Sequence, residues 1–243
     1  MKVINKFIDI HCHILPCVDD GSSSVQMTKN MLKIANDEGI STIIATPHFR
    51  LGMFENSDNV KKISELVDTL AQSVAPDMKV YIGNEIYFTE DFSWYLENGS
   101  IKTLNKSRYV LVEFPLYDTQ RHIKDSLYRF VLEGYTPILA HIERYGSLAE
   151  SVATAEELIK FGAYIQVNAD SIVGSTITRE KNFAKELLKE NLVHFIATDA
   201  HSDVHRAPRM REAYEYVCKK FGKDYATEIF IGNQRRVILD KEI

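Results

Sequence analysis

The chain has 243 residues, of which 45% are hydrophobic and 26% are charged, and its formal net charge is −5. This ordinary globular composition and this length suit one α/β domain, so we expect residues 1–243 to fold as a single domain. The acidic balance argues against a sequence-independent nucleic-acid binder, because such proteins neutralise phosphates with excess lysine and arginine. An anionic substrate would have to be captured locally.

The first residues lack the long apolar core and the cleavage site of a signal peptide, and no uncharged apolar run is long enough to span a membrane. We therefore expect a cytoplasmic protein without membrane insertion. The cysteines are odd in number, which does not suggest a disulfide framework and fits a reducing compartment. They are Cys12, Cys17 and Cys218.

Short β-branched or aromatic runs alternate with longer amphipathic segments, which is the pattern of repeated βα units around a parallel sheet. The predicted strands are Phe7–His11, Thr42–Thr46, Val80–Gly83, Tyr109–Glu113, Pro137–His141, Tyr164–Asn168 and Val193–Thr198. The predicted helices span residues 24–38, 57–74, 120–133, 154–161, 179–190 and 208–221. Three helical runs are followed by a glycine that suits a left-handed C-terminal cap: Gly39, Gly134 and Gly162. This alternation predicts an α/β barrel.

Nearly every predicted strand ends in a residue able to bind a metal. In chain order, the first strand ends in His11 and His13, the second in His48, the third in Glu85, the fourth in Glu113, the fifth in His141, and the seventh in Asp199 with His201. The C-terminal ends of the strands of a barrel meet at one mouth, where active sites are built. We therefore expect these scattered residues to form one site.

The pair His11 and His13 has the i, i+2 spacing that puts both imidazoles on one side of a strand. Alone, this pair would fit two partly buried histidines, and Asp19-Asp20-Gly21 would fit a turn. Burying so many imidazoles and carboxylates together, however, is costly without a cation. Mixed nitrogen and oxygen ligands favour manganese, iron, zinc or cobalt over calcium and magnesium, and ligand type alone does not exclude copper. So many ligands imply two or three ions, with Glu85 as a candidate bridge.

Two arginines lie beside these ligands in the sequence, Arg144 and Arg206. The planar guanidinium suits the oxygens of a phosphate and stays charged at any relevant pH, so phosphoryl chemistry is indicated. A thiol phosphatase would need an arginine six residues after its nucleophilic cysteine, but the residues at that spacing are Val18, Ser23 and Asp224. The Gly-x-Ser-x-Gly elbow and the glycine-rich phosphate loop with lysine are also absent, so covalent catalysis is disfavoured.

Taken together, the motifs resemble the polymerase and histidinol phosphatase (PHP) superfamily and, within it, the bacterial capsule-type protein-tyrosine phosphatases. The resemblance runs through the whole chain and is carried by Asp9-Ile10-His11-Cys12-His13, Val18-Asp19-Asp20-Gly21, Ala45-Thr46-Pro47-His48, Gly52-Met53-Phe54, Gly83-Asn84-Glu85-Ile86-Tyr87, Leu111-Val112-Glu113-Phe114, Ala140-His141-Ile142-Glu143-Arg144-Tyr145, Gln166-Val167-Asn168 and Ala197-Thr198-Asp199-Ala200-His201.

The resemblance implies a distorted (β/α)₇ TIM-like barrel with three divalent ions, usually manganese. It implies hydrolysis of phosphotyrosine on a tyrosine kinase of the polysaccharide operon, which regulates capsule or exopolysaccharide synthesis. An oligomer stays open. The implied ligand sets are His11, His13, Glu85 and Asp199 for one ion, Glu85, Glu113 and His141 for the second, and Asp20, His48 and His201 for the third, with Arg144 and Arg206 gripping the phosphate. Asp20 rather than Asp19 falls at the family's ligand position.

Our hypothesis for the reaction is in-line attack on phosphorus by a hydroxide that bridges two ions. The main alternative is a small-molecule phosphatase, such as a histidinol phosphatase, with the same metals. Aromatic residues near the strand ends bear on this choice because they could stack on a phosphotyrosine ring: Phe49, Tyr87, Phe88, Tyr117 and Tyr145. A third alternative is a metal-stabilised domain without catalysis.

Overall fold

The computed structural model describes residues 6–55, 57–174 and 177–243. Its strands are β1 (Phe7–Cys12), β2 (Ile40–Ala45), β3 (His48–Phe49), β4 (Lys79–Ile82), β5 (Glu85–Tyr87), β6 (Tyr109–Glu113), β7 (Thr136–Leu139), β8 (Tyr164–Asn168) and β9 (Phe195–Ala197). Every pairing between these strands is parallel. The seven predicted strands are confirmed, with ends that differ by about two residues.

The α-helices are α1 (Val25–Glu38), α2 (Ser57–Val74), α3 (Phe92–Glu97), α4 (Gln120–Leu132), α5 (Val152–Lys160), α6 (Ala169–Val173), α7 (Thr178–Lys189), α8 (Arg211–Phe221), α9 (Lys223–Thr227) and α10 (Asn233–Ile238). Short 3₁₀ turns lie at Leu104–Lys106 and Ile142–Arg144, and a π-helical turn at Glu228–Gly232 joins α9 to α10. The six predicted helices are confirmed. Among the described residues, none of the helices combines the length and apolarity needed to cross a membrane.

The expected glycine caps are also present. Gly39, Gly134 and Gly162 have φ angles of 94°, 84° and 94°, in the left-handed region that glycine enters without steric cost. At Gly39 the backbone N–H bonds back to the last turn of α1, and Phe7 N–H donates to the Gly39 carbonyl at 2.9 Å. The cap therefore also ties the end of α1 to the start of β1.

The prediction was wrong about where His48 and Glu85 stand. Both open a second short strand after a break, and do not end the second and third strands. The break before His48 contains Pro47, which has no N–H to donate, and its free carbonyl accepts from the Asn84 side chain at 2.9 Å and from Glu85 N–H at 3.2 Å. The two broken strands, β2/β3 and β4/β5, thus stay side by side across their breaks. The breaks change the direction in which the side chains of His48 and Glu85 point.

The strands close into a ring of seven when each broken strand is counted once. One sheet has the order β1-β2-β4 and the other β3-β5-β6-β7-β8-β9, joined through the two breaks. The ring closes between β1 and the end of β9, where Asp199 N–H donates to the His11 carbonyl and His13 N–H to the Ala200 carbonyl, both at 2.8 Å. The distorted (β/α)₇ barrel is therefore confirmed. The single domain over residues 1–243 stays a prediction.

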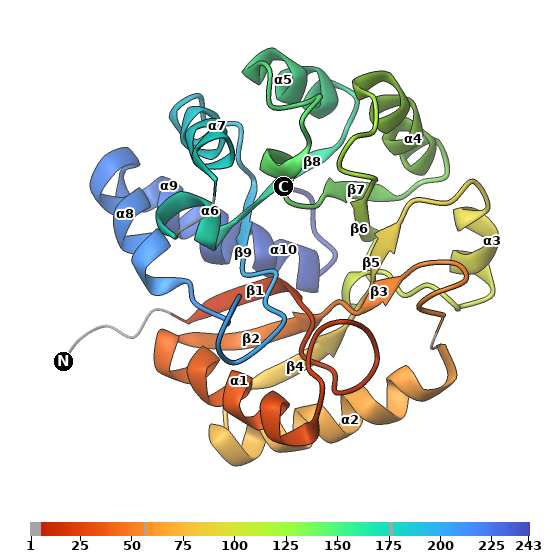
Figure 1. The fold of residues 1–243 in the computed structure, drawn as a ribbon, viewed down its shortest axis with the longest axis vertical. Helices are drawn as coiled ribbons and strands as arrows, with labels where there is room; N and C mark the ends of the chain where they lie inside the picture. Colours follow the sequence, from red (N-terminus) through yellow and green to blue (C-terminus); the bar gives the residue numbers. More distant parts are fainter. Residues whose placement is uncertain (1–5, 56, 175–176) are drawn as a thin grey trace.

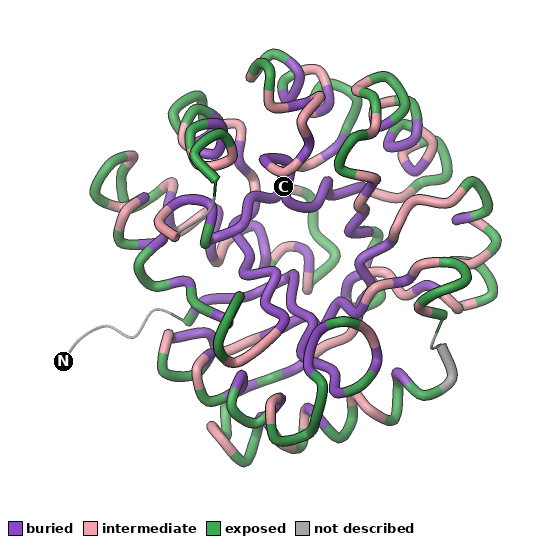
Figure 2. Tube along the Cα trace, viewed as in Figure 1, coloured by how far each residue is buried: buried purple, intermediate pink, exposed green. Residues whose placement is uncertain are grey.

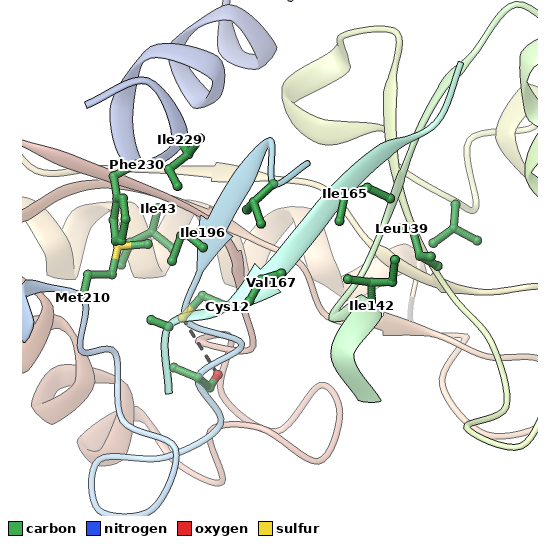
Figure 3. Close-up of a cluster of buried hydrophobic side chains, with 14 of the residues drawn as sticks. Cys12, Ile43, Leu139, Ile142, Ile165, Val167, Ile196, Met210, Ile229 and Phe230 are labelled. Atoms are coloured by element: carbon green, nitrogen blue, oxygen red, sulfur yellow. Dashed lines mark hydrogen bonds between the residues drawn. The ribbon is translucent and has the colours of Figure 1, made fainter. Parts of the chain in front are cut away.

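The helices surround the strands in Figure 1, and Figure 2 shows the strands buried while the outer faces of the helices are exposed. The larger apolar cluster lies between strands and helices; Figure 3 shows Val167 and Ile196 of neighbouring strands together with Met210 and Phe230 from the outer layer. A smaller cluster fills the barrel and includes Leu104 and Val237. The residues after α10 lie at the N-terminal ends of the strands. The Tyr109 hydroxyl, at the start of β6, donates to the Lys241 carbonyl there at 2.6 Å.

Candidate metal centre

The predicted ligands meet at the mouth of the barrel, the end where the C-terminal ends of the strands converge. His11, His13, Glu85 and Asp199 form a buried group whose ligand atoms lie within 4.8 Å of one another. The Nε2 atoms of His11 and His13 are 3.2 Å apart, and each lies 3.1 Å from Glu85 Oε2. The i, i+2 spacing at the end of β1 thus places both imidazoles on the same side, as predicted, and both lie beside one carboxylate oxygen.

A second group lies toward the solvent and contains the predicted set Asp20, His48 and His201, together with His13. Asp20 Oδ1 is 3.4 Å from His48 Nε2 and 3.6 Å from His201 Nε2. The Asp20 side chain is 60% exposed, so this group forms the outer edge of the site.

The third group contains Glu85 and Glu113 as predicted, but its histidine is His48, whose Nδ1 lies 2.8 Å from Glu113 Oε1. His141 still faces both carboxylates, with its Nε2 2.9 Å from Glu85 Oε1 and 3.8 Å from Glu113 Oε2. His48 therefore offers one ring nitrogen to each of two groups, and Glu85 belongs to two groups.

The donor set fits divalent cations. His48 Nδ1 is buried and has no hydrogen-bond partner, although two carboxylate oxygens lie within 3.2 Å of it. Buried polar atoms normally have a partner, and an imidazole nitrogen aimed at carboxylates without a hydrogen bond is arranged as a metal ligand would be. Since nitrogen and oxygen atoms are mixed in each group, the set suits transition metals.

The histidines and carboxylates at the site stabilise each other's charged forms. Burial raises the pKa of Glu85 and Asp199, but the adjacent histidines outweigh burial and hold both pKa values well below the usual range. Burial likewise lowers the pKa of His11 and His13, and the facing carboxylates outweigh it and raise both. The carboxylates are thus ionised, which is the form that binds metal.

Asp19 has a role that the sequence did not reveal. Its Oδ2 lies 2.7 Å from His13 Nδ1 and accepts from His48 N–H at 2.9 Å, and its Oδ1 accepts from Gly21 N–H at 3.0 Å. A carboxylate on the far nitrogen of a histidine fixes the ring and its tautomer, so His13 presents Nε2 to the site. The predicted choice of Asp20 over Asp19 as the group facing His48 and His201 agrees with this geometry.

β8 contributes no ligand and instead supports three of them. Gln166 Oε1 accepts from His141 N–H at 2.8 Å and lies 3.1 Å from His11 Nδ1. The Gln166 amide donates to Asn168 Oδ1 at 2.8 Å, and the Asn168 amide donates to Asp199 Oδ2 at 2.9 Å. In the sequence, the polar i, i+2 pair of Gln166 and Asn168 at a strand end is the signal that points to this role.

Arg144 and Arg206, which lie beside the ligands in the sequence, converge on the outer oxygen of Asp199. Arg206 Nη2 is 2.5 Å and Arg144 Nη1 is 3.8 Å from Asp199 Oδ2. Both line an open cleft of about 390 Å³ whose floor contains Glu85 and His141. An anion in this cleft would therefore meet two guanidinium groups and the ligand groups together.

Three of these residues have backbone conformations that are rare outside glycine. The φ angles are 34° for His141, 51° for Asp199 and 49° for Arg206. Such conformations cost free energy and persist where the surrounding structure enforces them, which occurs often at functional sites.

The five aromatic residues considered for ring stacking separate into two classes. Phe49 and Tyr145 are buried in the core, and Phe88 packs against it. Tyr87 and Tyr117 line the cleft. Only these two described candidates can therefore meet a substrate ring there.

Cys12 is a small core residue. Its side chain is fully buried beside Val167 and Ile196 (Figure 3), and burial raises the pKa of the thiol. Since the thiolate is the reactive form, this environment disfavours thiol chemistry at Cys12.

Comparison with known proteins shows the family to which the chain belongs. The family model "Capsular polysaccharide synthesis, CpsB/CapC" matches residues 7–239. The tyrosine-protein phosphatase CpsB of Streptococcus pneumoniae is 39% identical over 97% of this chain and 100% of its own length. The tyrosine-protein phosphatase YwqE of Bacillus subtilis is 34% identical over 89% of this chain and 86% of its own.

Among solved structures, one of YwqE from Bacillus subtilis and CpsB from Streptococcus pneumoniae, described as unique metal-dependent tyrosine phosphatases, matches with a TM-score of 0.90 and 31% identity, covering 97% of this chain and 96% of the other. A histidinol phosphate phosphatase from Lactococcus lactis has a TM-score of 0.58 at 18% identity, covering 88% and 93%, and so shares the fold. The expected resemblance is thereby confirmed, and the chain belongs to the CpsB/CapC family of capsular polysaccharide synthesis proteins.

Proposed function

We propose that this chain is a metal-dependent protein-tyrosine phosphatase. The observation that carries the proposal is the arrangement at the mouth: three overlapping ligand groups share His13, His48 and Glu85 and open into a cleft that holds two arginines. Relatives named tyrosine-protein phosphatases match over nearly the whole chain, which supports the same activity here.

We assign three divalent ions to the mouth, with manganese as the expected metal and iron, zinc or cobalt as alternatives. His11, His13, Glu85 and Asp199 would hold one ion, and Asp20, His48 and His201 would hold another. Glu85 and Glu113, with His141 facing both carboxylates, would hold the third. When bound, these ions would lower the pKa of water and offset charge on the phosphoryl oxygens.

The chain's own residues bind and orient the phosphate. Arg144 and Arg206 line the cleft and offer N–H groups to phosphate oxygens, with Asp199 setting the position of Arg206 through their 2.5 Å contact. Asp199 is itself held by Asn168, so the guanidinium is oriented before substrate arrives. Preorganised donors of this kind stabilise the charge that develops in the transition state.

The substrate we propose is a phosphotyrosine-bearing tyrosine kinase of the polysaccharide operon, met in the cytoplasm. The relatives' assignment to capsular polysaccharide synthesis supports this choice. Because the cleft is open and not enclosed, a phosphorylated segment of a protein can enter it.

The test compares a phosphotyrosyl peptide, the same peptide with phosphoserine, and histidinol phosphate, after chelation and re-addition of single metals. We expect chelated protein to be inactive, manganese to restore activity, and the phosphotyrosyl peptide to be preferred. A preference for histidinol phosphate would replace the proposal by a small-molecule phosphatase. Metal-loaded protein that hydrolyses none of the three would indicate a structural metal domain.

A further inference from the structure

A second layer of side chains lies directly outside the ligands of the two short strands. Tyr87 follows the ligand Glu85 at i, i+2 on β5, and Arg50 comes directly after the end of β3, two residues beyond the ligand His48. Residues two apart on a strand point to the same side, so Tyr87 continues the face that carries Glu85. The register agrees, because Tyr87 stands opposite the ligand Glu113 of β6.

The two members of this layer contact each other. The Arg50 guanidinium carbon lies 4.2 Å from the centroid of the Tyr87 ring, within the range of a cation–π interaction. Both line the cleft with Arg144 and Arg206, and both are partly exposed. The pair is thus an ordered, accessible platform at the wall of the cleft, which the proposed reaction does not use.

We propose that the Arg50–Tyr87 pair receives the aromatic ring of the phosphotyrosine and so selects phosphotyrosine over aliphatic phosphate esters. This inference rests on the proposed function and adds a specificity-determining surface to it.

The spacing along the strands supports the assignment. Two residues of strand rise by about 6.6 Å, so the platform stands roughly one aromatic ring outside the layer that would hold the phosphate. The phosphate of phosphotyrosine is separated from its main chain by the length of a phenol ring, whereas phosphoserine places its main chain close to the phosphate. A phosphotyrosine phosphate among the ligands therefore brings its ring level with Tyr87.

The neighbouring loop supplies a further surface for the same ring. Tyr117 lies in the loop after β6, is 90% exposed, and lines the cleft with Leu116. An aromatic side chain left this exposed beside a charged site is available to a ligand, because nothing in the described chain covers it. Tyr117 is a candidate to close over a ring that lies on Tyr87.

The test measures inhibition constants for phenylphosphonate and methylphosphonate, which are not hydrolysed and differ in the ring alone. For the unaltered manganese-loaded protein we expect phenylphosphonate to bind more tightly. In Tyr87→Ala the ratio of the methylphosphonate constant to the phenylphosphonate constant is expected to fall about three- to tenfold, which is the effect on binding usually caused by loss of one aromatic contact. Tyr87→Phe should retain the ratio. Tyr87→Leu, which keeps apolar bulk for folding, should lower it by a smaller factor.

Tyr128→Ala is the matched control, since Tyr128 is 42% exposed and packs against Phe161 away from the cleft. It should leave both constants unchanged. A ratio that stays constant in both Tyr87→Ala and Tyr87→Leu would overturn the inference, as would a proportional rise of both constants with loss of bound manganese. Failure of the proposed function is distinguishable, since it would appear as absent phosphotyrosyl-peptide hydrolysis in the unaltered protein.

Discussion

The two ends of the barrel are made from the same strands but differ in chemistry. On β6, Tyr109 at the N-terminal end is buried and bonds to the chain's last residues, whereas Glu113 at the C-terminal end faces His48 across 2.8 Å. Leu104 and Val237 plug the N-terminal end with apolar contacts. The opposite end carries buried histidines and carboxylates around an open cleft.

One end of the barrel therefore supplies stability and the other activity, as is general for barrels of alternating strands and helices. Burial normally disfavours charged groups, but at the mouth the histidines stabilise the ionised forms of Glu85 and Asp199. Substitutions at the mouth should therefore change activity and metal binding, whereas substitutions at the opposite end should change the free energy of unfolding.

The largest effect is expected at Asp199. Its Oδ1 faces His11 and His13 while its Oδ2 contacts Arg206, so Asp199→Ala removes a ligand and releases the arginine. We expect a loss of more than about 10³-fold in kcat/KM for a phosphotyrosyl peptide. Steady-state kinetics with manganese at saturation measures it, with circular dichroism to establish folding. Full metal-dependent activity in this variant would rule out the assignment of the centre.

Arg206 comes next. Arg206→Ala removes an oriented donor from the cleft and should lower kcat by about 10²–10³-fold. Arg206→Lys keeps the charge but not the planar fork, and should recover only part of the rate. Stoichiometric manganese in both variants is the control. Equal rates for the alanine variant and the unaltered protein would mean that Arg206 serves Asp199 and not the phosphate.

A smaller effect is expected for Gln166, which supports ligands without being one. Gln166→Leu removes the acceptor shared by His141 N–H and His11 Nδ1 and should weaken manganese binding by about 10–100-fold. The measurement is the manganese concentration that gives half activation, with calorimetric binding as a second readout. Gln166→Glu keeps an acceptor at this position and should bind manganese more tightly than the leucine variant. Identical affinities for all three proteins would remove the supporting role.

At the other end of the barrel, Leu104→Ala should reduce stability without changing catalysis. Leu104 is fully buried, and its Cδ2 lies against Gly83, so truncation leaves a cavity. The free energy of unfolding should fall by about 2–5 kcal/mol, as urea denaturation measures. The rate per folded molecule should not change. A drop in kcat at full folding would show that the two ends are coupled.

The smallest effect concerns pH and His194, which lies near the base beside the Tyr164 ring and receives Ile165 N–H at its Nδ1. Burial lowers its pKa from 6.5 to about 4, so protonation favours the unfolded chain. The contribution of the neutral His194 to the free energy of unfolding is therefore fully present above about pH 6.5 and is lost as pH falls toward 4. At pH 5 the free energy of unfolding should be lower by about 1–2 kcal/mol. Unfolding curves of the unaltered protein and His194→Asn, which keeps an acceptor, should differ in this slope; parallel pH profiles would contradict it.

The sequence was sufficient to predict the ring of strands and the meeting of the ligands. Runs such as Tyr109–Glu113 have clear strand character, and strand ends in a barrel converge by geometry. The breaks were not predicted, since Pro47 and Gly83-Asn84 could equally end a strand, and only pairing across the barrel shows that the strands resume at His48 and Glu85.

Other features depended on contacts between distant residues. Asp19 and Asp20 are chemically alike and adjacent, and which faces His13 is decided by how the loop folds back. Gln166 is not a ligand type, so its polar i, i+2 pair with Asn168 marks the strand end but does not show the contact with His11, 155 residues away. The short helices α9 and α10 were missed because each is too brief for helical periodicity to stand out.

The central claim is tested most directly by counting divalent ions. The chain would be stripped with chelator, reloaded with manganese, freed of excess metal and analysed for metal content alongside phosphotyrosyl-peptide turnover. The three ligand groups predict about three ions per chain, with activity appearing as they bind. A fully active chain that holds one ion or none would contradict the account.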